Sequence, residues 1–294
     1  MAGEKGIRKY AWVCFFLFPS LGGLALFTLT PILASLGLTL FEWDLLTSPR
    51  FAGLGNFRRM LFHDRNFWVA LRHTLYFIAG YIPLVMVIAL GVAVALNQKI
   101  KGRVLFRTAF FVPVVSAWVA VALLWKWIFN PRFGMLNYVL KFIGIEGLTW
   151  LFDPQLAMPA IIITSAWKDI GFVMVMYLAG LQGIPATYYE AAAIDGAGGL
   201  ARFRHITLPL LSPTTFFALI ISLINSFQVF DQVWIMTEGG PAGATIVLVE
   251  QIVKNAFSYS RMGYAYALSW VLFLLVFAVT ALQMRLQKRW VAFD

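Results

Sequence analysis

Polar side chains interrupt two long apolar stretches of the sequence, and their types suit hydrogen bonding to a polar solute. Lys168 and Asp169 lie near the middle of one stretch. A second stretch carries Ser222, Asn225 and Ser226, with Gln228 and Asp231 nearby. The first three share one helix face, because positions i, i+3 and i+4 align along a helix. Burying such groups among apolar residues is costly, so they are candidates for function, although hydrogen bonds between neighbouring helices explain the stripe equally well.

The residue types that covalent and metal chemistry require form no recognisable motif. The sequence has no GxxxxGK[ST] phosphate loop, and the GAGG at 196–199 lacks both the lysine and the preceding strand. It has no HExxH motif, and its histidines are scattered: His63, His73 and His205. The single cysteine, Cys14, excludes an intrachain disulfide and a cysteine-built metal site. We therefore expect a chain that is not an enzyme and that binds no metal and no cofactor itself.

The composition places the polar groups in a membrane. Of the 294 residues, 61% are hydrophobic and 12% are charged, whereas soluble domains are nearer roughly one half and one quarter. A bilayer can accommodate so much apolar surface, but a soluble fold of this length cannot bury it. The formal net charge of +10 is not arranged as a basic stripe with stacking aromatics. Basic residues beside membrane spans explain the charge, so we expect the lipid bilayer and no nucleic acid as a partner.

Six stretches are long enough to cross a bilayer, which takes roughly 20 apolar residues. They lie between Lys9 and Glu42 and at about 73–97, 108–125, 155–181, 206–230 and 262–284. The first is too long for the apolar part of a signal peptide, so we predict a retained span, kinked near Pro19 or Pro31. The predicted fold class is all-α, a polytopic membrane protein with six transmembrane helices. Residues 1–9 form a cytoplasmic N-terminus and 10–294 a single membrane domain.

Lysine and arginine residues near the span ends predict the orientation. With six spans, four basic groups fall on one side, which should be cytoplasmic: the N-terminus, the 99–107 connection, Arg202 with Arg204, and the C-terminus. The outer connections also hold arginines, at Arg50, Arg58, Arg59, Arg65 and Arg72, beside the acidic residues Glu42, Asp44 and Asp64. The bias toward one side is therefore real without being extreme.

The connection between the fourth and fifth predicted spans, residues 183–208, reads as a pair of short helices outside the lipid. Thr187 and Glu190 fit a capping box, in which each side chain bonds the other residue's backbone amide. The alanines at 191–193 favour a helix. Gly196 is a suitable stop, because glycine adopts the left-handed conformation at low cost.

A second short helix is predicted from Gly199 to His205, and Pro209 then opens the fifth span. The small residues of this connection let another protein approach closely, and its carboxylates and arginines offer ionic contacts at the rim. These properties suit a docking element. An ordinary amphipathic helix that lies at the interface between two spans is the alternative.

The spacing of this connection resembles the EAA loop of the membrane subunits of bacterial ABC importers. The pattern is Glu-Ala-Ala at 190–192, three residues, Gly196, nine residues, and Ile-x-Leu-Pro at 206–209, and every position is filled. The extended sequence YEAAAIDGAG is similar to the subset that imports carbohydrates. Supporting matches occur along the whole chain in NFWVALRHTLYF, NQKIKGRVLFRT, TEGGP and GYAYALSW.

The resemblance implies the fold of a type I ABC importer transmembrane domain. The similar subunits are the first permease subunits of maltose-, glycerol-3-phosphate- and lactose-type systems, without the large outer domain of the enterobacterial maltose subunit. It further implies a non-catalytic transport subunit in a bacterial or archaeal cytoplasmic membrane, with both termini in the cytoplasm. The implied partners are a second permease subunit of the same type, an ATPase dimer that binds ATP and magnesium, a periplasmic or extracellular solute-binding protein, and a carbohydrate.

The resemblance also assigns residues. Those that would couple to the ATPase through the EAA loop at 183–208 are Glu190, Ala191, Ala192, Asp195, Gly196 and Arg202. Sugar contacts fall on Lys168, Asp169 and Phe172 in the fourth span and on Ser222, Asn225 and Ser226 in the fifth, with Gln228 and Asp231 nearby. Trp167 could offer its ring to a pyranose face or could be filler that faces lipid.

Three alternatives remain open at this point. An importer of glycerol-3-phosphate or another phosphorylated polyol is favoured by Lys168 and weakened by the neighbouring Asp169. A secondary transporter has no need of a docking loop. A membrane enzyme lacks any catalytic constellation in this sequence.

Overall fold

The computed structural model describes residues 2–98, 100–145 and 147–290. The chain is 76% helical, with almost no strands among the described residues, so the predicted all-α class is confirmed. It divides into two compact units: unit 1 comprises Met1–Asp64 and Ile252–Val271, and unit 2 comprises Arg65–Gln251 and Leu272–Asp294. The helix α15 (Met262–Trp290) runs from one unit into the other.

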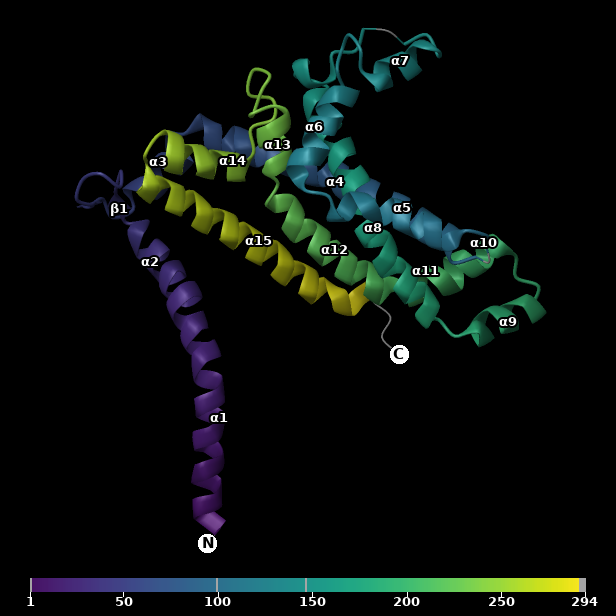
Figure 1. Ribbon diagram of the computed structural model, residues 1–294, viewed down its shortest axis with the longest axis horizontal. Coiled ribbons are helices and arrows are strands. Elements are labelled where there is room, and N and C mark those ends of the chain that lie inside the picture. The colour runs from purple at the N-terminus through teal and green to yellow at the C-terminus, as the bar shows by residue number, and fades with distance from the viewer. Residues whose placement is uncertain (1, 99, 146, 291–294) are drawn as a thin grey trace. The chain divides into compact units, whose positions relative to one another are not determined.

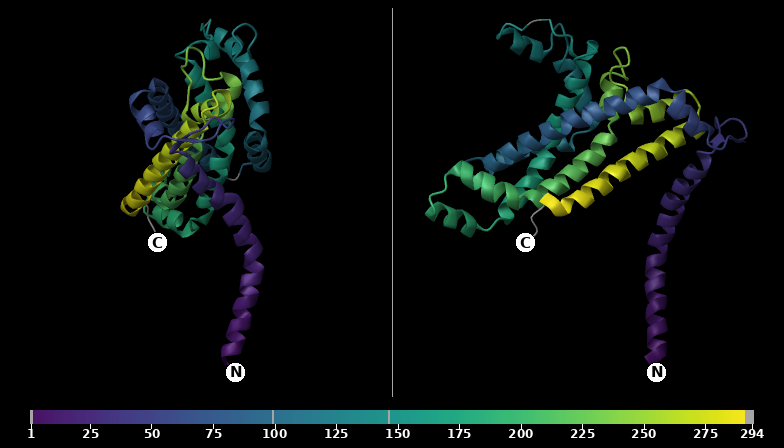
Figure 2. Two further views of the ribbon diagram at one scale, coloured as in Figure 1. Left: turned by 90° about the vertical axis from the view of Figure 1, so that its left-hand side faces the viewer. Right: turned by 180° about the vertical axis from the view of Figure 1, so that it is seen from behind.

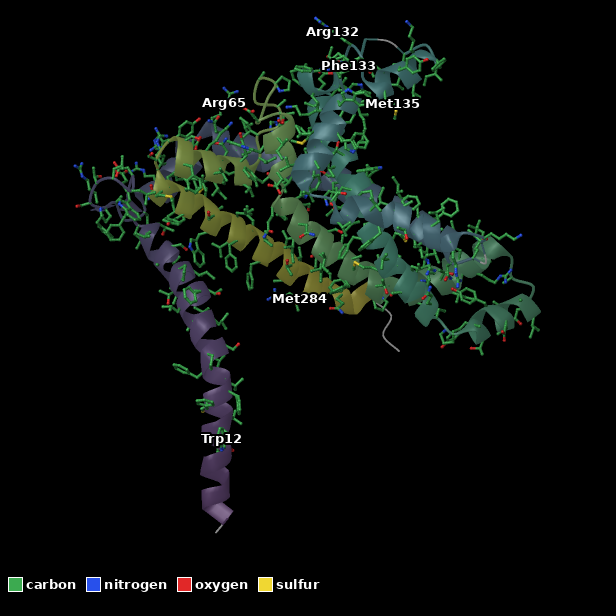
Figure 3. The ribbon with its side chains drawn as sticks, viewed as in Figure 1. Trp12, Arg65, Arg132, Phe133, Met135 and Met284 are labelled. Carbon is green, nitrogen blue, oxygen red and sulfur yellow. The ribbon has the colours of Figure 1, made fainter. Side chains whose placement is uncertain are left out.

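Unit 1 begins with a helical rod built from α1 (Ala2–Leu24), the π-helical turn η1 (Ala25–Leu29) and α2 (Thr30–Leu38), drawn in purple in Figure 1. Trp12 projects from this rod (Figure 3). The predicted kink was assigned to Pro19 or Pro31. Pro19 lies inside α1 without ending it, and the departure from regular α-helical bonding lies at η1, just before Pro31. There the Thr30 amide donates to the Ala25 carbonyl, five residues back.

A short hairpin follows the rod and is anchored on the start of α15. Its strands β1 (Phe41–Glu42) and β2 (Arg50–Phe51) are antiparallel, with Phe41 opposite Phe51 and Glu42 opposite Arg50. The helix α3 (Gly55–Phe62) comes next, and its Asn56 amide donates to the Thr39 and Phe41 carbonyls, at 2.8 and 3.0 Å. Gly263 has no Cβ, and one would collide with the Phe41 carbonyl oxygen, so glycine permits the hairpin to lie this close.

The remaining helices belong mainly to unit 2. They are α4 (Arg65–Leu96), α5 (Arg103–Val115), α6 (Trp118–Ile128), α7 (Met135–Lys141), the 3-10 turn η2 (Trp150–Phe152), α8 (Ala157–Gly183), α9 (Ala186–Ile194), α10 (Gly199–Arg202), the π turn η3 (Phe203–Thr207), α11 (Leu208–Leu210), α12 (Ser212–Phe227) and α13 (Asp231–Met236), followed by α14 (Leu248–Val253) and the π turn η4 (Lys254–Ser258), which lead into unit 1.

The core of unit 2 lies where α4 and α12 pack along α8 (Figures 1 and 2). The buried residues of α4 recur every four positions as Phe77, Tyr81, Val85, Ala89 and Ala93, which is the stripe expected of one helix face. The helix α5 also packs on α8, where a Cβ on Gly171 would collide with the Phe110 carbonyl oxygen. Small residues at such a crossing let helix backbones approach closely, as they do in membrane bundles.

Four helical segments are long and apolar enough to cross a membrane: 12–38, 65–96, 157–183 and 262–287. Two bent pairs raise the number to as many as six when each is taken as one span. The pair α5 and α6 bends by 103°, and the pair made by 199–210 and 212–227 bends by 63°. These six correspond in order to the six predicted spans, but the bends in the third and fifth were not predicted.

Within unit 2, connections that were predicted to share one side of the membrane do lie together. Asn97 and Gln98 after α4, Leu181 near the end of α8, and Arg202 of α10 line one hollow of about 510 Å³. At the other end of unit 2 lie Arg132 and Phe133, which follow α6, and Met135 at the start of α7 (Figure 3). Lys99, which belongs to the predicted basic connection, lies outside the described residues. The orientation of both termini stays a prediction.

Candidate functional site

A buried lysine, Lys168, binds the backbone where the third candidate span is broken between α5 and α6. Ser116 and Ala117 have extended backbone conformations between α5 and α6, so the last carbonyls of α5 lose their helical partners. Lys168 of α8 donates from Nζ to the Val114 carbonyl at 2.9 Å, and its ammonium lies 5.0 Å from the centre of the Trp118 ring. The side chain is only 6% exposed. Lys168 therefore caps the end of α5 and stacks on the start of α6.

Asp169, the next residue, points elsewhere. Its Oδ2 accepts a hydrogen bond of 2.8 Å from the Tyr81 hydroxyl of α4. The Tyr81 ring stacks on Phe77, one turn earlier in α4, with centroids 5.3 Å apart. Adjacent helical residues differ in direction by about 100°, so α8 sends its ammonium toward α5 and its carboxylate toward α4.

Two hollows meet at Asp169. One has a volume of about 300 Å³ and the other of about 190 Å³, and both are lined by Tyr81, Asp169 and Asn225. The larger also takes in Ser226, Gln228 and Asp231, together with Phe77, Trp118, Ser165, Val229, Phe230 and Gln232. The smaller takes in Lys168, Phe172 and Ser222, together with Val114, Val173 and Ile221. The structure thus brings together all the predicted substrate-path residues except Trp167.

Trp167 lies edge-on against Trp125 of α6, with ring centroids 5.5 Å apart, and lines neither hollow. Of the two interpretations of this side chain, the geometry favours packing. Ser222 and Ser226 are buried, and the Ser226 hydroxyl is already bonded to the Leu223 carbonyl of its own helix at 2.8 Å. Asn225 and Gln228, whose amides each line the larger hollow, are therefore the better hydrogen-bonding groups of this stripe.

Sequence reasoning missed several residues that complete the site. Tyr81, Phe77 and Trp118 supply aromatic rings to the larger hollow, and Gln232 donates to the Ser165 hydroxyl at 3.2 Å beside it. From the sequence alone, an aromatic residue in an apolar span is interpreted as a packing residue. The signal that could have found Tyr81 is its phenol, because a buried hydroxyl needs a hydrogen-bond partner.

The EAA loop differs from its prediction at the start of its first helix. Pro185 is the N-cap of α9, and no side-chain cap bond forms there. The predicted capping box of Thr187 and Glu190 is therefore wrong. Proline has a fixed φ and no amide hydrogen, so α9 begins directly after it and Thr187 becomes an ordinary residue of the first turn.

The end of α9 agrees with the prediction. Gly196 has φ of +76°, the left-handed region that favours glycine. The Gly196 amide donates to the Ala193 carbonyl at 3.1 Å, and the Ala197 amide to the Ala192 carbonyl at 2.8 Å. These two bonds form a Schellman motif, which satisfies the last carbonyls of the helix. The second helix begins at Gly199 as predicted and continues through η3 toward Pro209.

The predicted coupling residues do not all face the same way. Glu190, Ala191, Asp195 and Gly196 are exposed, and Ala192 is half-buried. The apolar side chains of Ile194 and Leu200 on the same loop are 87% and 81% exposed, and sequence reasoning did not single them out. Arg202 instead lines the hollow beneath the ends of α4 and α8, near the hydrogen-bonded hydroxyls of Tyr189 and Thr207. Arg202 therefore faces this hollow, whereas Glu190, Ala191, Asp195 and Gly196 are exposed.

The TEGGP sequence forms a tightly bonded turn on α14. The hydroxyls of Thr237 and Thr245 lie 2.8 Å apart, and Thr245 also donates to the Gly240 carbonyl at 2.6 Å. A Cβ added to Gly239 would lie 2.6 Å from Oε1 of Glu250, which is fully buried.

In the described part of the chain, no group of three or more His, Cys, Asp or Glu side chains could hold a metal ion.

Comparison with known proteins extends over almost the whole chain. The family model described as a binding-protein-dependent transport system inner membrane component matches residues 67–292. A probable ABC transporter permease of Bacillus subtilis (strain 168), YesP, is 37% identical, with 100% of this chain and 96% of that protein covered. The lactose transport system permease LacF of Rhizobium radiobacter is 39% identical, with 95% and 96% covered.

A solved structure shares the fold. It is a bacterial alginate ABC transporter in complex with an alginate pentasaccharide-bound periplasmic protein. The TM-score is 0.84 over 97% of this chain and 96% of that chain, at 22% identity. At this identity the likeness bears on the fold alone, and it matches the predicted importer type of transmembrane domain.

Proposed function

Because the chain belongs to the family of binding-protein-dependent transport system inner membrane components, we propose that it conducts a carbohydrate through the membrane as half of an ABC importer's translocation path. It is a multi-pass membrane permease subunit. The lactose permease among its relatives supports the carbohydrate class. The observation that carries the proposal is the pair of hollows that meet at Asp169 in the core of unit 2.

The chemistry of these hollows suits sugar hydroxyls. A carboxylate accepts hydrogen bonds, and the amides of Asn225 and Gln228 both donate and accept. Phe77 and Trp118 add ring surface to the larger hollow. Sites for small molecules combine a few placed polar groups with aromatic and apolar walls in this way. Lys168 already donates to the Val114 carbonyl, and the Asp169 carboxylate beside it would repel a phosphate, so the site favours a neutral sugar over glycerol-3-phosphate.

Energy is proposed to enter through the EAA loop. The exposed face of α9, with Glu190 and Ile194, and the exposed Leu200 would bind a groove on separate ATPase subunits, which would hold ATP and magnesium. The Schellman motif at Gly196 fixes the turn between α9 and α10, so the loop can act as a stiff lever. The path would alternate between an inward-facing and an outward-facing state. ATP binding can shift this equilibrium only if the closed ATPase dimer binds one of the two states more tightly than the other.

The remaining partners follow from the family. A second permease subunit of the same type would supply the other half of the path. A solute-binding protein would deliver the sugar from the outer side, as the family description implies. The termini and the EAA loop would then face the cytoplasm.

The test is uptake into proteoliposomes that contain the full chain with its co-purifying membrane and ATPase subunits and its solute-binding protein. Lactose, maltose, trehalose and glycerol-3-phosphate serve as labelled probes. We expect ATP-dependent uptake of a neutral sugar, reduced by about tenfold or more in Asn225→Ala, because the amide's hydrogen bonds are lost. Trp167→Phe, whose ring lies outside both hollows, should transport normally.

Two results would count against the proposal. Uptake that proceeds equally well without ATP would indicate a secondary transporter. Uptake confined to glycerol-3-phosphate would replace the sugar with a phosphorylated polyol as the substrate.

A further inference from the structure

Three arginines on the outer connections gather around one hollow in unit 1. The hollow has a volume of about 400 Å³, and its lining includes Arg50, Arg59 and Arg261 with the rings of Trp43 and Tyr264. Arg50 lies in β2, Arg59 lies in α3, and Arg261 directly precedes α15. Segments 200 residues apart in sequence therefore bring their guanidinium groups to the same place.

The frame of this hollow is held by its own hydrogen bonds. Asp44 Oδ1 accepts from the Leu46 amide, the Thr47 amide and the Thr47 hydroxyl, at 2.7 to 3.0 Å. The bonds from Thr47 and then from Leu46 hold the pKa of Asp44 below its ordinary value, so this carboxylate stays ionised and occupied with its turn. The Met262 amide donates to the Trp43 carbonyl at 2.9 Å, which ties the hairpin to α15.

Two of the guanidinium groups lie over tyrosine rings. Arg59 lies over the Tyr264 ring at 5.5 Å, and Arg261 lies over the Tyr259 ring at 5.7 Å. The Tyr264 hydroxyl donates to Asp64, which fixes the ring beneath Arg59. A planar guanidinium presents its donors as a fork at its edge, in a geometry that matches the oxygens of a carboxylate or a phosphate.

The third guanidinium has a charged neighbour. Arg50 lies opposite Glu42 across the hairpin, and Glu42 also lines the hollow. With Asp44 occupied by its turn, the charge left for a ligand is the positive charge of Arg59 and Arg261. The hollow is thus suited to an anionic group that can sit between two guanidinium forks.

The place of these arginines in the chain points to the kind of anion. Basic residues near span ends on the outer side oppose the positive-inside bias, so their presence there needs a function of its own. The candidate span 12–38 ends just before the hairpin, and the candidate span 262–287 begins just after Arg261. The hollow therefore lies at the depth where a span meets the headgroups of a bilayer, and Trp43 and Tyr264 are the ring types typical of that level.

We propose that this hollow binds the phosphate of a membrane phospholipid, with Arg59 and Arg261 as its principal ligands and the glycerol and acyl chains running along the adjoining spans. The site is separate from the path at Asp169 and does not rest on the proposed transport function. Glu42 would accept a hydrogen bond from the headgroup's hydroxyl or ammonium group. If the six spans alternate, the lipid belongs to the leaflet opposite the EAA loop.

The test compares three probes on the purified full chain by native mass spectrometry. Palmitoyl-oleoyl phosphatidylglycerol carries both phosphate and acyl chains, dioleoylglycerol carries acyl chains alone, and glycerol 3-phosphate carries phosphate alone. We expect retention of phosphatidylglycerol and at least about tenfold weaker binding of the other two, because each lacks one half of the interaction. Arg59→Gln with Arg261→Gln should weaken phosphatidylglycerol binding by about tenfold or more.

Arg58→Gln is the matched control, because Arg58 neighbours Arg59 in α3 but does not line the hollow. It should bind phosphatidylglycerol as the unsubstituted chain does. Arg261→Gln alone is a second variant in case the double substitution fails to fold, as judged by its elution profile, and it too should weaken binding. Equal binding by the control and the pocket variants would overturn the proposal. Glycerol 3-phosphate binding as tight as that of the lipid would assign the hollow to a soluble anion instead.

Discussion

Two neighbouring residues of α8 have different tasks. Lys168 bonds the Val114 carbonyl at the break between α5 and α6, whereas Asp169 bonds Tyr81 and faces the two hollows. The resemblance assigned both to the sugar path. The geometry instead favours a largely structural part for the lysine and a binding part for the carboxylate. This division can be tested one residue at a time.

Substituting Lys168→Met should lower the stability of the folded chain. The substitution keeps the apolar stem but leaves the Val114 carbonyl without its ammonium donor, and an unsatisfied buried acceptor costs about 1–3 kcal/mol. Thermal unfolding in detergent would report the loss as a lower Tm. An unchanged Tm combined with abolished sugar uptake would show instead that Lys168 contacts the substrate.

Substituting Tyr81→Phe should raise the KM for uptake by about tenfold, since the hydroxyl that orients the Asp169 carboxylate is lost while the stack on Phe77 is kept. Tyr177→Phe is the control, because that hydroxyl lies 4.0 Å from the Met86 sulfur and lines neither hollow. A normal KM in the Tyr81→Phe variant, measured in proteoliposomes, would show that the Tyr81 hydroxyl does not contribute to sugar binding.

At the scale of the element, glycines decide where helices end and how closely they cross. Gly196 ends α9 in the left-handed region, and Gly171 lets α8 approach the backbone of α5. The first glycine is required by its φ angle and the second by the absence of space for a Cβ. Each therefore predicts a different outcome when it is substituted.

Substituting Gly196→Val should abolish ATP-driven uptake while membrane insertion continues. A β-branched residue in the left-handed region costs about 1–2 kcal/mol or more, so the Schellman motif would open and the lever would lose its fixed turn. Gly198→Ala is the control, because Gly198 has φ of −68° and no atom within 4 Å of an added Cβ. Normal uptake by the Gly196→Val variant would show that energy coupling does not require this turn.

Substituting Gly171→Ala should destabilise the bundle by about 1–3 kcal/mol, the usual cost of overpacking, since the new methyl group meets the Phe110 carbonyl. Gly91→Ala in α4 has open space around its Cβ and should be neutral or slightly stabilising. The comparison of the two Tm values in detergent checks the prediction. Equal Tm values would mean that α5 can move away from α8 at little cost.

At the scale of the whole molecule, we propose that the chain supplies part of the path and a coupling loop, while separate subunits hydrolyse ATP. It has no phosphate-loop motif, and the exposed EAA loop offers apolar side chains such as Ile194 to a partner. We expect the purified chain alone to hydrolyse no ATP, and the chain co-purified with its ATPase subunits to show hydrolysis that the sugar-loaded binding protein stimulates. A phosphate-release assay checks both. Hydrolysis that co-elutes with the isolated chain would contradict this division of labour.

The sequence by itself determined the features that depend on local composition and spacing. Apolar runs between charged residues located all six span candidates, because the length needed to cross a bilayer is a property of one segment. The spacing at 190–209 identified the EAA loop by resemblance, and Gly196 predicted its turn, because a left-handed stop depends on a single residue. The capping box at Thr187 failed because Pro185 set the start of the helix two residues earlier.

The tertiary structure alone decided which of these segments meet. Asp169 bonds Tyr81 across 88 residues of sequence, and Lys168 reaches the carbonyl of Val114 at a break in a different helix. Neither pairing follows from the spacing within one segment, because the direction of a buried side chain is set by the helices packed around it. The sequence therefore determined which segments are long and apolar enough to cross a membrane, while packing determined which of the costly polar groups line the two hollows and which hold the bundle together.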